Sequence, residues 1–163
     1  MDESIEALVE KYRIKGVMFD TNLLLLLVVG IYRQDRIKTF KRTAKYTLSD
    51  FRLVVTIFDR FDRRVTTPNI LTETDNLARQ LPREEHRNVA DVMALLVDRL
   101  FEQYEPSVQA IHDKWFPSLG LADCVTASSA QDLLVVTDDF RLYNVLASLK
   151  RAAININHFR TLD

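Results

Sequence analysis

Carboxylates stand at two positions where this sequence predicts the end of a buried strand. Asp20 follows the short apolar run 17–19, and Asp138 and Asp139 follow the branched apolar run 133–137. Runs of this length are typical of buried strands. If the two strands are parallel neighbours, their terminal carboxylates meet at one edge of the sheet, where open α/β sheets bind ligands. Asp20 taken alone fits a helix cap as well as a functional role, and it is the partner acids that favour function.

Two further acids belong to predicted helices near the same edge. Thr67-Pro68 is a helix-start signal, which places Glu73 in the first turns of the following helix. Asp123 opens a helix rich in small residues that leads into the second strand. Carboxylates gathered at one edge repel each other unless cations neutralise them. The pattern therefore predicts a site for Mg²⁺ or Mn²⁺, hard ions that prefer oxygen ligands and that assist phosphodiester hydrolysis.

Other chemistries have weaker support in the sequence. The three histidines, His86, His112 and His158, lack metal-type spacing. There is no glycine-rich phosphate loop and no G-x-S-x-G motif. Cys124 has no Cys or His neighbour and is interpreted as a small buried side chain.

The elements that must position the acids alternate between strand and helix. This order predicts an α/β fold with a parallel sheet and right-handed crossovers. Residues 33–47 are basic and aperiodic, so they are predicted to form a loop or lid, and Ser49 is predicted to cap the next helix. Helices are predicted over 4–12, 22–32, 49–61, 69–80, 83–104, 108–114, 119–130 and 140–150, and strands over 14–20, 65–67, 133–137 and 152–156.

Length and composition indicate one globular domain. The chain has 163 residues, of which 47% are hydrophobic and 28% charged. Its single cysteine fits a reducing, cytoplasmic location. Residues 1–13 do not resemble a secretory signal, and the apolar stretch 23–31 is about half as long as a membrane span. We therefore expect a cytoplasmic protein in which this stretch is a buried helix.

The formal net charge of −1 argues against a nucleic-acid binder held by bulk charge. The charge is uneven, however, because residues 33–64 hold ten basic and four acidic side chains, a net +6. Phosphate would be attracted to this part of the molecule. Arg33, Arg36, Lys41 and Arg42 are the predicted substrate contacts, and a solvated charged loop is the alternative interpretation.

The acidic motifs, taken in order, resemble those of the PIN-domain ribonucleases. The resembling stretches cover almost the whole chain: Asp20-Thr21-Asn22, Thr67-Pro68 leading to Glu73, Leu121-Ala122-Asp123, and Thr137-Asp138-Asp139. The resemblance implies one PIN-like domain over residues 1–163, with a Rossmann-like three-layer α/β/α fold. It also implies a Mg²⁺- or Mn²⁺-dependent nuclease of single-stranded RNA. Many small members are toxins of toxin–antitoxin pairs and many are dimers, so an antitoxin and a second copy of the chain are the protein partners it suggests.

The resemblance also suggests the residue roles. Asp20, Glu73, Asp123 and Asp139 would be catalytic metal ligands, and Asn22 and Thr137 would support them. Two features depart from the family. The segment between Asn22 and Glu73 is longer than in small members, and the last motif offers two acids.

Alternation along an extended chain puts Asp139 on the same side as Thr137 and Asp138 on the opposite side. In the family pattern Thr137 faces the site. Asp139 is therefore the favoured ligand, with Asp138 either an alternative ligand or the cap of the next helix.

The motifs leave two alternatives to a nuclease to consider. One is a PIN-like module that holds RNA or a protein without cutting, against which the retention of all four acids argues. The other is a phosphatase of the haloacid dehalogenase type, which needs a carboxylate at the position of Asn22 and is therefore excluded.

Overall fold

The structure is a computed structural model that describes residues 3–162, and its centre is a sheet of five parallel strands. The strands are β1 (Val17–Phe19), β2 (Arg64–Thr66), β3 (Phe101–Glu102), β4 (Leu134–Thr137) and β5 (Ala153–Asn155). They lie in the order β3-β2-β1-β4-β5, so the first strand is central. Met18 pairs with Val65 on one side and with Val135 on the other. This register brings the carboxyl ends of the three central strands to one edge.

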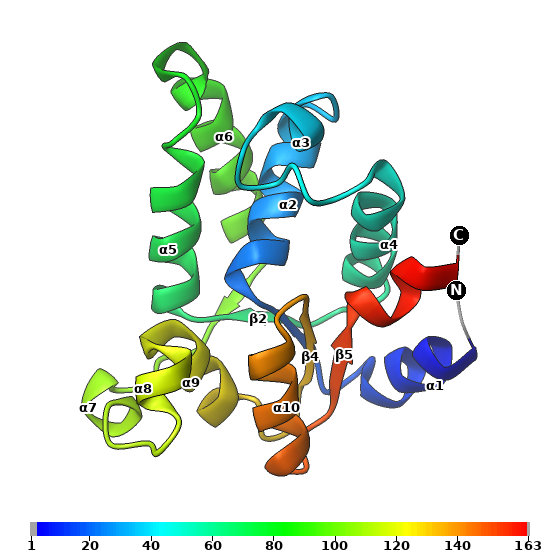
Figure 1. The fold of residues 1–163 in the computed structure, drawn as a ribbon, viewed down its shortest axis with the longest axis vertical. Helices are drawn as coiled ribbons and strands as arrows, with labels where there is room; N and C mark the ends of the chain where they lie inside the picture. The colour runs from blue at the N-terminus through cyan, green and yellow to red at the C-terminus, as the bar shows by residue number, and fades with distance from the viewer. Residues whose placement is uncertain (1–2, 163) are drawn as a thin grey trace.

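Helices cover both faces of the sheet, which confirms the predicted α/β class with three layers (Figure 1). The helices before β3 are α1 (Glu3–Tyr12), α2 (Thr21–Tyr32), α3 (Arg36–Thr39), α4 (Leu48–Asp59), α5 (Pro68–Ala78), the short 3₁₀ turn η1 (Arg83–Glu85) and α6 (His86–Val97). Those after β3 are α7 (Ser107–Ala110), α8 (Phe116–Leu119), α9 (Leu121–Ser129), α10 (Phe140–Ser148) and η2 (Ile156–Leu162). The chain reverses direction across the sheet after β3. Crossovers between parallel strands are right-handed as a rule, and with that hand the reversal places the later helices on the other face.

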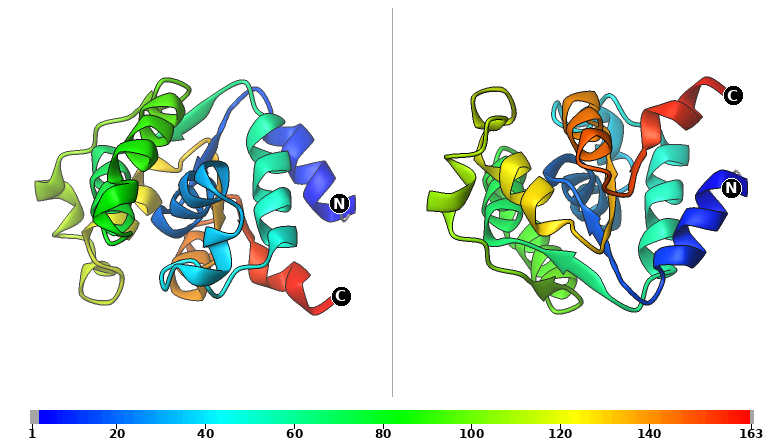
Figure 2. Two further views of the ribbon diagram at one scale, coloured as in Figure 1. Left: turned by 90° about the horizontal axis from the view of Figure 1, so that it is seen from above. Right: turned by 90° about the horizontal axis from the view of Figure 1, so that it is seen from below.

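The larger hydrophobic core surrounds α2. Every residue from Leu23 to Gly30 is buried, as expected for a helix that is apolar on all sides. Gly30 permits α4 to approach closely, since a Cβ at this position would lie 2.3 Å from the ring of Phe51. Helix α1 lies below α4 in the view of Figure 1, with both helices on the right-hand side in each view of Figure 2, and adds Ile5 and Val9 to this core. Across residues 3–162, no helix is both long and apolar enough to span a bilayer.

A smaller core lies between the sheet and the later helices. Val135 packs there with Ala127 from α9 and Leu146 from α10. Leu134 and Val136, its neighbours in β4, belong to the larger core. Alternate side chains of a strand point to opposite faces, so this buried strand separates the two cores.

Three predicted helix boundaries are wrong. The helix predicted over 108–114 ends at Ala110. The helix predicted over 83–104 ends at Val97, and the chain then forms β3, a two-residue edge strand that pairs with β2. Pairing with a neighbouring strand is a tertiary effect that helical periodicity does not reveal. The cap of α4 is Thr47 and not Ser49. Thr47 accepts from the Asp50 backbone N–H at 3.0 Å, while Asp50 accepts from the Thr47 N–H at 2.7 Å, which forms a capping box.

Residues 33–47 are a packed segment, not the predicted loop or lid. They contain α3, and they bury Ile37, Phe40, Thr43 and Tyr46. Arg36 forms a two-point ion pair with Glu85, with Nε 3.0 Å from Oε2, and Arg42 Nε donates to Gln80 Oε1 at 2.7 Å. These contacts attach the segment to the chain that joins α5 to α6. Basic residues in this segment therefore have structural partners that the sequence pattern did not indicate.

We expect Arg36→Ala to lower the free energy of unfolding by about 2–3 kcal/mol, because it leaves the buried carboxylate of Glu85 without a partner. Lys41→Ala is the matched control, since Lys41 is exposed and should change stability by less than about 0.5 kcal/mol. Urea unfolding of the two variants measures both values. Equal, small effects would show that the Arg36–Glu85 pair does not hold the segment.

Candidate active site

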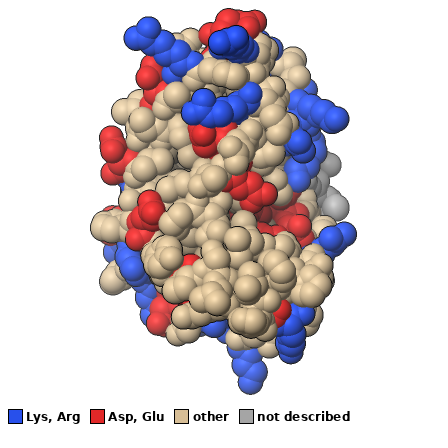
Figure 3. Space-filling view, turned by 90° about the vertical axis from the view of Figure 1, so that its left-hand side faces the viewer, with Lys and Arg blue, Asp and Glu red and all other residues tan. Residues whose placement is uncertain are grey.

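A cavity of about 670 Å³ opens at the carboxyl edge of the sheet, between the start of α5 and α9. Its lining includes four of the predicted acids, and acidic side chains gather in a hollow across the middle of the face shown in Figure 3. The four acids in the lining come from four different elements: Asp20, Glu73, Asp123 and Asp139. The fold thus brings together side chains that lie up to 119 residues apart in the sequence.

Asp20 stands where β1 turns into α2, and its side chain is almost completely buried. One carboxylate oxygen accepts from the Leu23 backbone N–H at 2.8 Å and so caps α2. The other accepts from the Thr137 hydroxyl and from the Asp138 backbone N–H, the latter at 3.1 Å. Asp20 therefore caps its helix and lines the cavity, so the two interpretations of this residue are compatible.

Glu73 reaches the cavity from α5. Thr67 caps this helix, accepting from the Ile70 N–H at 3.3 Å, and Pro68 occupies its first position. Glu73 is thereby held near the start of α2, where the Thr21 hydroxyl donates to its Oε2 at 2.9 Å. The sequence indicated Thr21 only as a favourable residue for the start of a helix, so its hydrogen bond to Glu73 was not predicted.

Asp123 lies in the first turn of α9 and is partly buried. The helix follows Gly120, whose φ of +80° favours glycine. Among the residues that the structure describes, no group donates a hydrogen bond to the Asp123 carboxylate. Asp123 is therefore a partly buried acid that, among the described residues, has no hydrogen-bond donor to compensate its charge.

The two acids of the last motif point in different directions. Asp139 lines the cavity and also caps α10, accepting from the backbone N–H groups of Arg141 at 2.6 Å and Leu142 at 3.3 Å. Asp138 is not in the cavity lining and does not cap the helix, so its predicted role as a cap is wrong. Asp139 provides the cap instead. Its backbone N–H donates to the Thr137 hydroxyl at 2.9 Å, and this bond fixes the backbone directly before the helix.

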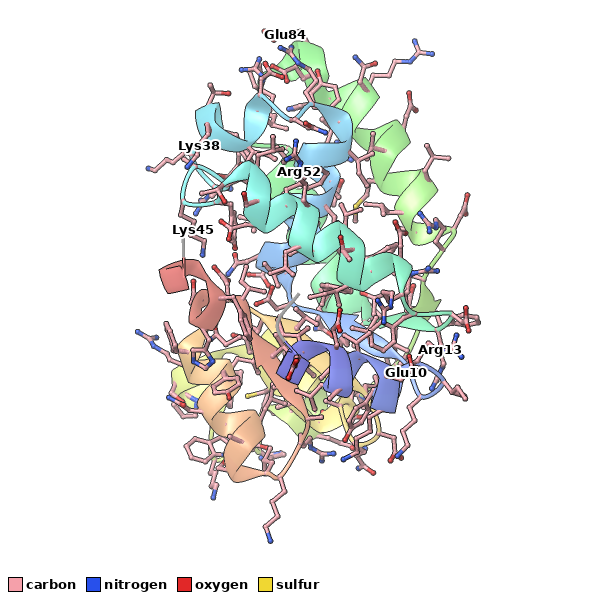
Figure 4. The ribbon with its side chains drawn as sticks, turned by 90° about the vertical axis from the view of Figure 1, so that its right-hand side faces the viewer. Glu10, Arg13, Lys38, Lys45, Arg52 and Glu84 are labelled. Carbon is pink, nitrogen blue, oxygen red and sulfur yellow. The ribbon has the colours of Figure 1, made fainter. Side chains whose placement is uncertain are left out.

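Asp138 is instead the centre of a buried polar network. Its carboxylate accepts from Asn22 Nδ2 at 3.1 Å and from the Tyr46 hydroxyl at 2.8 Å, and it forms an ion pair with Lys45. Figure 4 shows Lys45 at the end of the 33–47 segment that lies above η2, while Lys38 of the same segment points away from the molecule. The segment thus reaches the site through Asp138 and holds the amide of Asn22, which does line the cavity. Sequence reasoning missed Lys45 and Tyr46 because only the tertiary fold brings them to Asp138.

The carboxylates interact electrostatically across the cavity. Burial, followed by the charge of Asp138, raises the pKa of Asp20 from 3.8 to about 7. Burial also raises the pKa of Asp123 to about 7, with further contributions from the charges of Asp20, Asp139, Glu73 and Asp138. These raised pKa values place the protonation of both acids in the neutral range.

The donor set of the cavity fits a divalent cation. Within residues 3–162, no group of three His, Cys, Asp or Glu side chains lies close enough together to coordinate one metal ion in the present conformation. The cavity lining nevertheless offers four carboxylates and, within the described part of the chain, neither lysine nor arginine. Carboxylates without a cationic side chain are suitable ligands for Mg²⁺ or Mn²⁺, which keep several waters and need few protein ligands.

The predicted substrate-binding residues lie elsewhere. None of Arg33, Arg36, Lys41 and Arg42 belongs to the lining of the described cavity. Arg33 pairs with Asp35 at 3.0 Å, and Arg36 and Arg42 make the contacts to Glu85 and Gln80 given above. Lys41 is exposed to solvent. Their part in RNA binding stays a prediction.

In comparisons with known proteins, no family model, no curated protein and no solved structure matches this chain. The resemblance to PIN-domain ribonucleases therefore depends on the four sequence motifs themselves. Each of these motifs supplies one carboxylate to the cavity lining: Asp20, Glu73, Asp123 and Asp139.

Proposed function

We propose that this protein is a Mg²⁺- or Mn²⁺-dependent endoribonuclease that hydrolyses phosphodiester bonds of single-stranded RNA. The observation that carries the proposal is the convergence of four carboxylates in a cavity whose lining has no cationic side chain. An RNA phosphate would be repelled from such a cavity unless metal ions entered with it. The resemblance to PIN-domain ribonucleases supports RNA as the substrate.

Each residue of the cavity has a distinct task in this proposal. Asp20, Glu73, Asp123 and Asp139 would hold the metal, which would lower the pKa of a water molecule and offset charge on the phosphate. The hydroxyls of Thr137 and Thr21 fix the carboxylates of Asp20 and Glu73. Because Asp138 holds Asn22 Nδ2, the carbonyl oxygen of Asn22 is left to accept a hydrogen bond from the attacking water.

The wider setting follows from the same resemblance. We propose that the enzyme acts in the cytoplasm, where its single buried cysteine stays reduced. An antitoxin protein is the partner to seek, and a homodimer is the expected assembly. The competing function is a module that binds RNA or protein without cutting. It differs from the nuclease in requiring no metal for its activity.

The test is a cleavage assay on a single-stranded RNA, the same sequence as DNA, and the RNA annealed to its complement. We expect cleavage of the single-stranded RNA with Mg²⁺ or Mn²⁺ and none with EDTA. Binding of the RNA without cleavage under any metal condition would favour the non-catalytic module. Asp20→Asn is the inactive reference, although it also replaces a hydrogen-bond acceptor used by Leu23 and Thr137.

A second test separates the two acids of the last motif. Asp139→Asn should lower metal-dependent cleavage at least tenfold, or about 1.4 kcal/mol, because Asp139 lines the cavity. Asp138→Asn should mainly lower stability, by about 1–2 kcal/mol, because it weakens charged hydrogen bonds with Tyr46 and Lys45. Activity and thermal unfolding are measured on both variants. A folded but inactive Asp138→Asn variant, beside an active Asp139→Asn, would reverse the assignment.

A further inference from the structure

The cavity has a second, uncharged part that metal binding does not explain. Its volume of about 670 Å³ is in the range of pockets that enclose a whole small-molecule ligand. Besides the acids, the lining includes one exposed aromatic side chain, Tyr104, and a neutral polar stripe on α5. The stripe consists of Asn69, Thr72 and Asn76, whose spacing of three and four residues puts them on one face of the helix together with Glu73.

Tyr104 is placed by the sheet itself. It follows β3, whose pairing with β2 continues through the hydrogen bond from the Gln103 N–H to the Thr66 carbonyl at 2.8 Å. Tyr104 therefore stands at the same carboxyl edge of the sheet as Asp20, and the start of α5 and the α7–α9 segment face each other there (Figure 1). Tyr104 is 75% exposed, and among the described residues its ring packs against no other aromatic ring and no cation. Burial in the core thus does not account for a tyrosine at this position.

The polar stripe is equally free to bind a ligand. Within the part of the chain that the structure describes, the side chains of Asn69, Thr72 and Asn76 have no hydrogen-bond partner. Carboxamides both donate and accept hydrogen bonds, as the edge of a nucleobase does. An aromatic ring and carboxamides in one cavity therefore suit a planar ligand with a polar edge, and that combination describes a nucleobase.

We propose that the uncharged part of the cavity is a nucleobase subsite, in which Tyr104 stacks on an unpaired base and the amides of Asn69 and Asn76 contact its edge. The inference rests on the proposed nuclease function, because the base would flank the phosphate held at the carboxylates. It also supplies a physical basis for single-strand selectivity. A base in a duplex is covered on both faces by its neighbours, whereas an unpaired base offers a free face to Tyr104.

The test measures equilibrium binding rather than turnover. A fluorescein-labelled single-stranded RNA is titrated with Asp123→Asn protein and with Asp123→Asn/Tyr104→Ala, so that cleavage during the titration is negligible. Stacking on an aromatic side chain contributes about 1–3 kcal/mol per base, so Tyr104→Ala should raise Kd about 5- to 150-fold. Tyr104→Phe, which keeps the ring, should stay within about threefold. Phe101→Ala is the matched control, because Phe101 is 58% exposed and lies in β3 outside the cavity lining.

Abasic substitutions then identify the base. A single abasic position in the RNA should weaken binding as Tyr104→Ala does, and the two changes together should weaken it no further. The rise in Tm caused by Mn²⁺ should be the same in wild-type protein and in the Tyr104→Ala variant, because the ring is not a metal ligand. If Tyr104→Ala leaves Kd unchanged, or if no abasic position couples to it, the subsite is disproved while the nuclease remains. If RNA binds through Tyr104 but is never cleaved by the wild-type protein, the nuclease is disproved and the subsite stands.

Discussion

Asp123→Asn is expected to abolish most cleavage and at the same time to stabilise the protein. Asp123 lines the cavity, and no group among residues 3–162 donates a hydrogen bond to its carboxylate. The substitution removes the proposed metal ligand and its charge without leaving a hydrogen-bond donor unpaired. We expect cleavage to fall at least about 100-fold, or about 2.7 kcal/mol of transition-state stabilisation.

The gain in stability has the same electrostatic origin as the loss of activity. At pH 8 without metal, Asp123 is a partly buried carboxylate facing four other acids. Replacing it with a neutral isostere removes that repulsion. Because the group is partly exposed, solvent screens the interaction, and we expect a rise in Tm of about 2–4 °C, which corresponds to about 1 kcal/mol. Thermal unfolding in EDTA buffer measures this shift.

Asp132→Asn is the matched control, since Asp132 is highly exposed and, among the described residues, its side chain forms only an ion pair with Lys15 at 3.7 Å. It should change neither cleavage nor Tm measurably. An Asp123→Asn variant that loses activity together with stability would show that Asp123 serves the fold and not a metal site.

The second large effect is a pH-dependent stabilisation by Mn²⁺. The pKa values of Asp20 and Asp123 are raised to about 7 in the folded protein, above their ordinary value of 3.8. The folded state therefore holds more protons than the unfolded state between about pH 4 and pH 7. Stability without metal should fall as pH rises through this window and should stay low above it.

In the proposed function, metal ions bind the deprotonated carboxylates, and this binding should reverse the loss of stability. At pH 8, Mn²⁺ at about twenty times its Kd should add about 1.8 kcal/mol of stability. For a chain of this size the gain corresponds to a rise in Tm of about 4–7 °C. At pH 5.5, proton competition weakens binding by about 30-fold for each carboxylate with a pKa of 7, and the rise should fall below about 1 °C.

Differential scanning fluorimetry at the two pH values, with and without Mn²⁺, measures the effect directly. The control is Asp123→Asn, in which the response to Mn²⁺ at pH 8 should be reduced to that of wild-type protein at pH 5.5. A response of equal size at both pH values would place metal binding outside the carboxylate cluster, and no response at millimolar Mn²⁺ would contradict the metal site.

The sequence by itself determined the parts of this protein that depend on local chemistry. The apolar runs before Asp20 and Asp138 predicted strands β1 and β4, because short apolar runs bounded by polar residues are typical of buried strands. Thr67-Pro68 predicted the start of α5, because a cap and a fixed φ act within one turn. The carboxyl ends of parallel strands lie at one edge of a sheet, and this rule predicted that the four acids converge there.

Tertiary structure alone decided what depends on contacts between distant residues. The edge strand β3 exists because β2 offers it a partner, although its sequence continues a helical period. Asp138 and Asp139 have the same chemistry and adjacent positions. They differ because Asn22, Tyr46 and Lys45 surround the first, whereas the start of α10 and the cavity receive the second. The sequence pattern predicted that the basic residues of 33–47 are solvated or contact substrate. In the fold, Arg36 instead pairs with the buried carboxylate of Glu85, 49 residues away. Such pairings carry no local signal, because their free energy arises only when the folded chain excludes water from both partners at once.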